Sequence, residues 1–241
     1  MRREEVFVTT KVACPADLQP QWPPFYTDFE TEYLTDLSLS AYDGLLAEFF
    51  SSLSRLGLGY VDCLLVHWPG HPANTLGPAA ANKRREMWAA MEYIYQLGLA
   101  RSIGVSNWSE DHLREIFKVC SERPHLNQLE NHPALQQQAL VRFCQSEGVA
   151  VSAYSPIAGT DLSEPTLLDI ASAHDVTAEA VVYRWLQQRG LSVLTKSTKP
   201  ERAAANLAAA AGGWELSPEE MAAMAGLERD GRREIDPHDI Q

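Results

Sequence analysis

Short apolar segments alternate with amphipathic helical segments through most of this 241-residue chain, and this alternation limits the fold more than any other feature. Strands that alternate with helices form right-handed parallel βαβ units, because each helix must cross back over the sheet. The predicted strands are β-branched runs bounded by turn residues. They are Val6–Thr10, Val61–Val66, Ser102–Val105, Leu126–Leu129, Val149–Ala153 and Leu191–Leu194.

Eight helices are predicted from apolar spacing, terminal glycines and cap residues, among them Ser40, Ser109 and Thr177. They cover about 40–56, 82–97, 109–120, 137–147, 165–174, 178–189, 201–210 and 218–227. In the first helix, the apolar stripe is predicted to consist of Leu45, Leu46, Phe49, Phe50 and Leu53. Residues 13–37, rich in proline and aromatic side chains, predict a long loop. Since the sequence contains no internal repeat or low-complexity linker, we expect one domain over residues 1–241.

A polar residue stands at the carboxyl end of every predicted strand. These residues are Lys11, His67, Ser106 with Asn107, Gln128, Tyr154 with Ser155, and Lys196 with Ser197. The glycine-rich phosphate loop of a doubly wound open sheet is missing from the sequence. Polar groups at all strand ends are typical of a barrel, whose site is built by several βα loops. The sequence therefore predicts an α/β fold of the (β/α)8 TIM-barrel type, with about six of the eight strands in this chain.

The strand that ends at His67 carries the most specific chemical signal. It is continuously apolar, as in a strand covered on both faces, and Trp68 follows the imidazole directly. This arrangement predicts a site that holds a polar atom against an apolar wall. A buried histidine that is satisfied by a backbone carbonyl is the structural alternative.

Composition narrows the class of protein. The net charge of −12 argues against a nucleic-acid or anionic-membrane partner, because such surfaces require clustered lysine and arginine. The cysteines (Cys14, Cys63, Cys120 and Cys144) lack the spacing of a metal site and indicate reduced thiols. No apolar run approaches the roughly 20 residues that cross a bilayer. We therefore expect a cytoplasmic protein without a metal.

Six segments, in order, resemble the aldo-keto reductase family over nearly the whole chain. They are Val8–Lys11, Tyr60–Pro69, Ile103–Asn107, Asn127–Pro133, Ala153–Pro156 and Thr195–Arg202. Members of that family are (β/α)8 barrels that transfer hydride from NADPH to an aldehyde or ketone. The resemblance implies the same cofactor and a small carbonyl substrate beside His67 and Trp68.

The resemblance also assigns the residues that bind the nicotinamide. Tyr154 would stack on the ring, while Ser106, Asn107 and Gln128 would hydrogen-bond its carboxamide, and Ser155 belongs to the same cofactor site. Independently of the family, an aromatic face and convergent amide groups suit a flat polar heterocycle. A core aromatic that lines the barrel is the alternative for Tyr154.

A basic cluster precedes the alanine-rich helix near residue 201. The resemblance implies that Lys196, Ser197 and Arg202 hold the 2′-phosphate of NADP and that Asn206 contacts the adenine, and Thr198 belongs to the same cofactor site. A helix amino end and a planar guanidinium both favour a phosphate. A solvated helix start is the alternative. The family usually has a glutamate directly before that asparagine, and because Ala205 stands there, we expect a weaker grip on the adenosine.

The family's catalytic set consists of a tyrosine, an aspartate, a lysine and a histidine, of which Lys11 and His67 match the last two. The tyrosine and aspartate normally precede the lysine strand, and no counterpart is found here; Tyr26 or Tyr33 is a remote substitute for the tyrosine. Three alternatives follow. The chain is an amino-terminally truncated reductase, a catalytically silent NADP-binding protein, or an interaction module. We expect a monomer for the full-length family form, with oligomers through exposed strand edges as the alternative.

The substrate itself is not specified by the sequence, because the predicted substrate loops, 13–37 and 158–164, carry no recognisable motif.

Overall fold

A computed structural model describes residues 2–13, 40–70, 78–233 and 236. The predicted loop at 13–37, with Tyr26 and Tyr33, lies outside the described residues apart from Ala13. Contacts within the chain divide it into two compact units, residues 1–127 with 236–241, and residues 128–235. The strand around residue 128 belongs to both, and the single-domain organisation stays a prediction.

Six strands are present among the described residues, and their hydrogen-bonded order follows the sequence, β1-β2-β3-β4-β5-β6. They are β1 (Thr9–Val12), β2 (Cys63–Val66), β3 (Ile103–Ser106), β4 (Leu126–Glu130), β5 (Ala150–Tyr154) and β6 (Leu191–Val193). The pairs β1–β2, β2–β3 and β5–β6 are all parallel. The predicted α/β class with about six parallel strands is confirmed.

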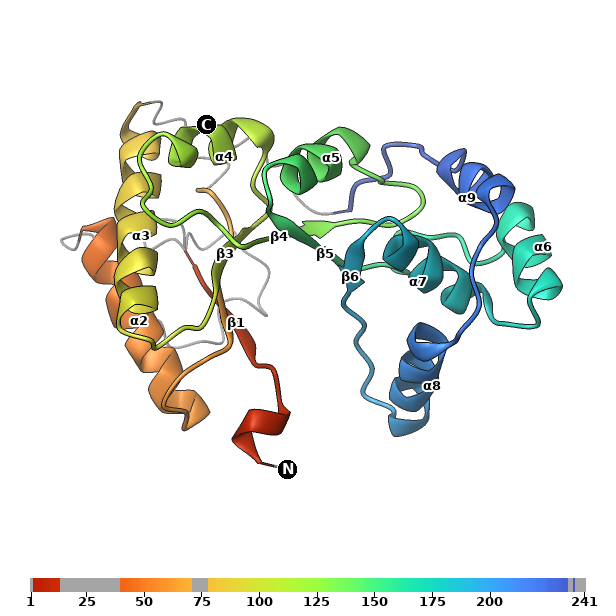
Figure 1. Ribbon diagram of the computed structural model, residues 1–241, viewed down its shortest axis with the longest axis horizontal. Coiled ribbons are helices and arrows are strands. Elements are labelled where there is room, and N and C mark those ends of the chain that lie inside the picture. The colour runs from red at the N-terminus through yellow and green to blue at the C-terminus, as the bar shows by residue number, and fades with distance from the viewer. Residues whose placement is uncertain (1, 14–39, 71–77, 234–235, 237–241) are drawn as a thin grey trace. The chain divides into compact units, whose positions relative to one another are not determined.

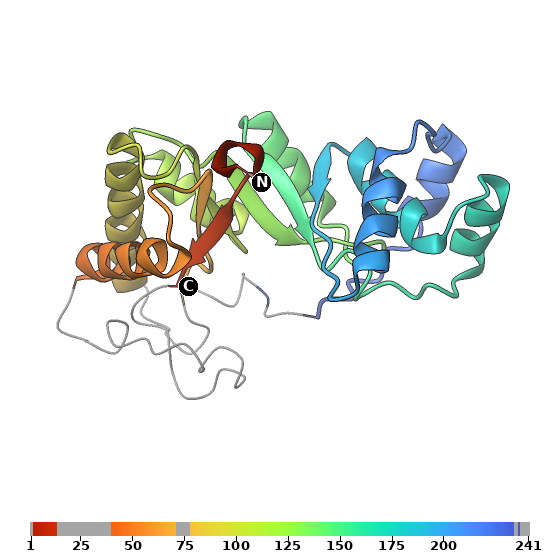
Figure 2. The ribbon, with the colours of Figure 1, turned by 90° about the horizontal axis from the view of Figure 1, so that it is seen from below.

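The first unit contains the short 3-10 helix η1 (Arg3–Glu5) and the helices α2 (Ala41–Leu56), α3 (Pro78–Gln96) and α4 (Glu110–Phe117). Ser40 caps α2 by accepting a hydrogen bond from the backbone N–H of Asp43, and Ser109 caps α4 in the same way. The helices α2 and α3 lie side by side (Figure 1), and β1 lies beside α2 (Figure 2).

The core of the first unit follows the helical spacing of its apolar residues. Leu45 and Phe49 of α2 are fully buried, as are Met87, Met91 and Ile94 of α3. The prediction of Phe50 in this stripe is wrong, because its side chain is 45% exposed. Consecutive residues of a helix point about 100° apart, so a buried stripe about 100° wide does not cover both Phe49 and Phe50. Phe49 occupies the buried position.

The amino-terminal turn is held to the first unit by charge and stacking. The guanidinium groups of Arg3 and Arg101 each lie 4.1 Å from the centroid of the Tyr60 ring. The carboxylate of Asp62 pairs with Arg3 at 2.7 Å and Arg101 at 3.5 Å, and accepts a hydrogen bond from the backbone N–H of Val8 at 2.9 Å. Arg3 and Val8, which make these contacts, precede β1.

They also explain one wrong prediction. The first strand was predicted at Val6–Thr10, whereas β1 begins only at Thr9. The side chain of Phe7 is 72% exposed, and that of Val6 is 37% exposed. Both residues favour strands locally, but the described backbone pairing with β2 starts at Val8, whose carbonyl accepts hydrogen bonds from Asp62 and Cys63.

The second unit contains α5 (Gln138–Ser146), α6 (Pro165–Ala173), α7 (Ala178–Gln188), α8 (Pro200–Ala211) and α9 (Pro218–Ala225). Figure 1 shows α7 next to α6, α8 and β6, and the core of the unit is built around it. Val181, Tyr183 and Trp185 of α7 are each at most 1% exposed. Thr177 caps this helix as predicted, through the backbone N–H of Ala180.

Candidate active site

Lys11 and His67 lie on one face of the sheet in the first unit. Lys11 of β1 is the register partner of Leu65 in β2, and partners in a parallel pair direct their side chains to the same face. Side chains alternate along a strand, so His67, two residues after Leu65, shares that face. The backbone N–H of His67 donates to the carbonyl of Val12 at 2.9 Å, which extends the pairing beyond β2. The register thus brings an amine and an imidazole together.

His67 is neutral near pH 7. Burial and the positive charge of Lys11 lower its pKa to about 4. Burial also lowers the pKa of Lys11. Trp68 is 6% exposed, and its ring centroid lies 6.2 Å from that of His67. A neutral imidazole against an indole can offer one N–H to a carbonyl oxygen while it excludes water.

Two buried polar residues lie at the carboxyl end of β3, Ser106 as its last residue and Asn107 directly after it. Ser106 is 1% exposed and Asn107 is 3% exposed. Asn107 has a φ of 61°, in the left-handed region that asparagine enters more readily than most residues. Its side-chain amide donates to the backbone carbonyl of His67 and to Oγ of Ser106, both at 3.2 Å. The end of β3 is therefore tied directly to the end of β2.

Gln128 and Tyr154 lie in the second unit. Gln128 was predicted at a strand end, but β4 continues to Glu130, so Gln128 lies within the strand and is 4% exposed. Tyr154 is the last residue of β5, and its carbonyl accepts a hydrogen bond from the backbone N–H of Asn131 at 3.3 Å. Ser155 follows with a φ of 53°. Tyr154 is half-buried.

The basic cluster surrounds the start of α8. Lys196, Thr198, Lys199 and Arg202 are exposed, whereas Ser197 and Asn206 are half-buried. Lys199 is the N-cap residue, and its side chain makes no capping hydrogen bond. Oγ of Ser197 accepts from the backbone N–H of Lys199 at 3.0 Å, which orders the turn before the helix. Cationic side chains at an exposed helix start fit an anion such as a phosphate.

Three features of the site region were not predicted. Glu48 of α2 accepts a hydrogen bond from the backbone N–H of Ala13 at 3.1 Å, and burial raises the pKa of its carboxyl group to about 7. In α7, the hydroxyl of Tyr183 donates to Oδ1 of Asn206 at 3.4 Å. Neither contact could be found from spacing along one helix, because Glu48 meets the amide of Ala13 and Tyr183 meets a side chain of α8.

The third unpredicted feature is a buried pair in the second unit. Nε2 of His132 lies 3.2 Å from Oε1 of Glu130, and both side chains are at most 1% exposed. The backbone N–H of Arg233 donates to the same carboxylate at 3.0 Å. The loop after β5 packs directly on the imidazole, because a Cβ atom at Gly159 would lie 2.1 Å from Nε2 of His132. The pair thus holds the carboxyl-terminal segment and the β5 loop together.

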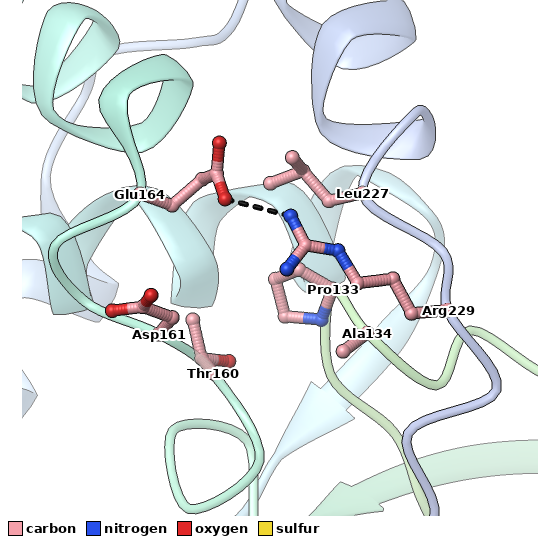
Figure 3. A pocket seen from close by; sticks show the side chains of 7 residues that line it. All are labelled: Pro133, Ala134, Thr160, Asp161, Glu164, Leu227 and Arg229. Atoms are coloured by element: carbon pink, nitrogen blue, oxygen red, sulfur yellow. Dashed lines mark hydrogen bonds and ion pairs between the residues drawn. The ribbon is translucent and has the colours of Figure 1, made fainter.

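The second unit also contains a pocket (Figure 3). It is lined by Pro133, Ala134, Thr160, Asp161, Glu164, Leu227 and Arg229. Arg229 and Glu164 form an ion pair of 2.8 Å across it. None of the predicted site residues lines this pocket.

The predicted site residues thus fall into separate groups. Lys11, His67, Trp68, Ser106 and Asn107 belong to the first unit, and the remaining ones belong to the second. Each group is ordered by its own hydrogen bonds. That both groups serve one cofactor stays a prediction.

Comparison with known proteins identifies the family. The sequence model of the Aldo/keto reductase family matches residues 1–229. The chain belongs to this family. Among curated relatives, the uncharacterized oxidoreductase YtbE of Bacillus subtilis is 34% identical over 236 residues, covering 98% of this chain and 72% of YtbE. The 9,11-endoperoxide prostaglandin H2 reductase of Trypanosoma cruzi is 35% identical over 241 residues, with the same two coverages.

Solved structures of aldo-keto reductases share the fold. The Bombyx mori aldo-keto reductase in complex with NADP is 30% identical, with a TM-score of 0.78 over 97% of this chain and 71% of that one. An aldo-keto reductase from a Medee basin deep-sea metagenome library is 26% identical, with a TM-score of 0.80 over 100% and 78%. The predicted membership of the (β/α)8 class is confirmed. Among the described residues, no helix is long and apolar enough to span a membrane.

Proposed function

We propose that this chain is an oxidoreductase that transfers hydride from NADPH to an aldehyde or ketone. The observation that carries this proposal is the neutral His67 beside Lys11, against the indole of Trp68. A carbonyl oxygen needs a hydrogen-bond donor and a nearby positive charge as negative charge develops on it. This face of the sheet supplies both groups within an apolar wall.

The residues of the chain fit the cofactor that the family implies. Asn107 and Gln128 are buried amides of the kind that bind a carboxamide, and Tyr154 is a half-buried aromatic residue at the end of β5. The exposed cations at the start of α8 suit the 2′-phosphate of NADP, with Arg202 as a planar donor. The proposed cofactor residues are Ser106, Asn107, Gln128, Tyr154, Ser155, Lys196, Ser197, Thr198, Arg202 and Asn206.

In the proposed reaction, bound NADPH supplies the hydride. His67 orients the carbonyl group by donating a hydrogen bond to its oxygen. Lys11 stabilises the negative charge that develops on that oxygen, Trp68 packs against the reacting face, and the alkoxide takes a proton from water to give the alcohol. A small dicarbonyl is a suitable first substrate, since a Bacillus subtilis glyoxal reductase is 36% identical to this chain over 200 residues.

The test is NADPH oxidation with glyoxal, followed by nicotinamide absorbance. We expect His67→Gln to lower kcat/KM by about 10²-fold, the lower range for loss of one hydrogen-bond donor to the reacting oxygen. NADPH binding without turnover would instead indicate a silent NADP-binding protein. A ligand at about 100 times its dissociation constant adds roughly 2.7 kcal/mol to the free energy of unfolding. If NADPH adds no such stability, an interaction module is indicated.

The basic cluster is tested separately. Arg202→Ala should raise the Kd for NADPH by about tenfold or more, as for loss of a charge-assisted hydrogen bond, and leave the Kd for NADH nearly unchanged. Arg142→Ala, an exposed arginine on α5, is the matched control. Equal weakening of NADPH and NADH would contradict the assignment of a 2′-phosphate site.

A further inference from the structure

The side-chain amide of Asn206 is held by a tyrosine of the neighbouring helix. Tyr183 of α7 is 1% exposed, and its hydroxyl donates a hydrogen bond to Oδ1 of Asn206 at 3.4 Å. A buried tyrosine hydroxyl needs a hydrogen-bond partner, and because α7 packs directly against α8, this amide supplies one. Burial, and then the negative charge of Glu179, raises the pKa of Tyr183, so its hydroxyl stays protonated and acts as the donor.

This hydrogen bond fixes which way the amide points. A side-chain amide has an acceptor oxygen and a donor nitrogen, and turning it by 180° exchanges the two. In the exchanged orientation the hydroxyl of Tyr183 would accept from Nδ2, and its own proton would be left buried without an acceptor, which is costly. In the part of the chain that the structure describes, Nδ2 of the half-buried Asn206 makes no hydrogen bond. The nitrogen is therefore a donor that points in a fixed direction.

Asn206 lies one helical turn beyond Arg202. Residues four apart share a helix face, and one turn advances by about 5.4 Å along the axis. In NADP the 2′-phosphate and the adenine are attached to the same ribose, so two successive turns of one helix suit these two groups. After Arg202, Asn206 is the only polar residue of α8, because the rest of the helix consists of alanines and Leu207. Its amide is thus the polar side chain that α8 offers to the base.

We propose that Tyr183 is a positioning residue that makes the cofactor site select adenine, by holding the amide of Asn206 in the orientation that recognises the 6-amino group. An asparagine amide recognises adenine by accepting a hydrogen bond from the amino group and donating one to N7. Oδ1 has two lone pairs, so it accepts from Tyr183 and from the base at the same time. This inference rests on the proposed NADPH-dependent function and adds a selectivity for the base, which the basic cluster does not contact.

Hypoxanthine tests the orientation of the amide, because it differs from adenine at position 6. It has a carbonyl oxygen there, an acceptor, in place of the amino group, whereas N7 is the same in both bases. Oδ1 of the held amide would face this oxygen without a hydrogen bond between them. An amide that is free to turn would instead donate from Nδ2 to the oxygen.

The experiment compares the Kd of NADPH with that of reduced nicotinamide hypoxanthine dinucleotide phosphate, by titration of nicotinamide fluorescence. The two dinucleotides share the nicotinamide, both riboses and the 2′-phosphate. We expect the unsubstituted chain to bind NADPH about tenfold more tightly, within the range for a bidentate contact between an amide and a base. In Tyr183→Phe this preference should be almost entirely lost, because the released amide adapts to either base.

The variants separate positioning from a general structural effect. Tyr183→Phe keeps the buried ring, and Tyr183→Leu is a second variant that also lacks the hydroxyl. Tyr93→Phe, which removes an exposed hydroxyl from α3, is the matched control and should leave the ratio of the two Kd values unchanged. Asn206→Ala should abolish the discrimination, and adding Tyr183→Phe to it should change the ratio no further, since the tyrosine acts through the amide.

Three results would overturn the inference. The unsubstituted chain binds both dinucleotides with equal Kd, Tyr183→Phe weakens both equally, or the effect of Tyr183→Phe on the ratio persists in the Asn206→Ala background. In each of these cases NADPH still binds, so the proposed reductase function stands. A chain that binds neither dinucleotide would reject that function and this inference together.

Discussion

Glu48 makes the stability of this protein depend on pH near neutrality. Burial raises the pKa of its carboxyl group from an ordinary value of 4.5 to about 7. In the described residues, its Oε1 accepts one hydrogen bond, from Ala13, and its buried Oε2 accepts none. A carboxylate with so few donors is costly to ionise in a poorly solvated position.

The sign follows from proton binding. Between about pH 4.5 and pH 7 the folded protein retains the proton of Glu48 and the unfolded chain has lost it, so the free energy of unfolding falls as pH rises. The difference of about 2.5 pKa units corresponds to about 3 kcal/mol, which is fully lost above the folded-state pKa. Below the unfolded-state pKa, Glu48 costs no such energy.

Glu48→Gln should remove this dependence. The amide has nearly the same shape, can accept the hydrogen bond from Ala13 and does not ionise. We expect the variant to be more stable than the parent by up to about 3 kcal/mol at about pH 8 and nearly equal to it at about pH 4.5, as measured by urea unfolding. Glu215→Gln, at an exposed position, is the matched control. If the difference in unfolding free energy between the parent and Glu48→Gln is the same at both pH values, the reasoning is refuted.

Further predictions concern the packing and the cofactor site. Asp62→Asn should cost about 1 kcal/mol, because it removes the ion pairs with the partly exposed Arg3 and Arg101. The pKa of Asp62 is lowered by the backbone N–H of Val8 and then by Arg3, so its contribution should be present above the ordinary aspartate pKa and lost as pH falls below it in an acid unfolding titration. Gly104→Ala should lower Tm, because the new Cβ would lie 2.4 Å from the carbonyl oxygen of Leu126, whereas Gly59→Ala, with no atom within 4 Å, should have little effect. If NADPH binds as proposed, Tyr183→Phe should raise its Kd severalfold by releasing Asn206, while the preference for NADPH over NADH stays the same in fluorescence titrations.

The parts of the fold that depend on local chemistry could be predicted from the sequence. Ser40, Ser109 and Thr177 were predicted as caps and all accept the expected backbone hydrogen bond. A continuous apolar run that stops at a polar residue predicts the end of a buried strand. As predicted, His67 follows β2 and Tyr154 ends β5.

The errors arose where tertiary contacts outweigh local preference. Val6 and Phe7 favour strand formation, but pairing with β2 begins after them, so they remain exposed. The environment of Glu48 depends on the amide of Ala13, 35 residues away, which no spacing along α2 can reveal. The contact between Tyr183 and Asn206 likewise joins two helices whose packing is not encoded in either alone.

The tight approach of Gly159 to His132 has a practical consequence for protein engineering. Libraries that aim to change substrate preference through the segment after β5 should keep residue 159 as glycine, since any larger residue would push on a fully buried ring. Diversity can be introduced at Thr160, Asp161 and Glu164, which line the pocket. Packing against His132 thus fixes residue 159 as glycine, whereas the positions that line the pocket can accept other side chains.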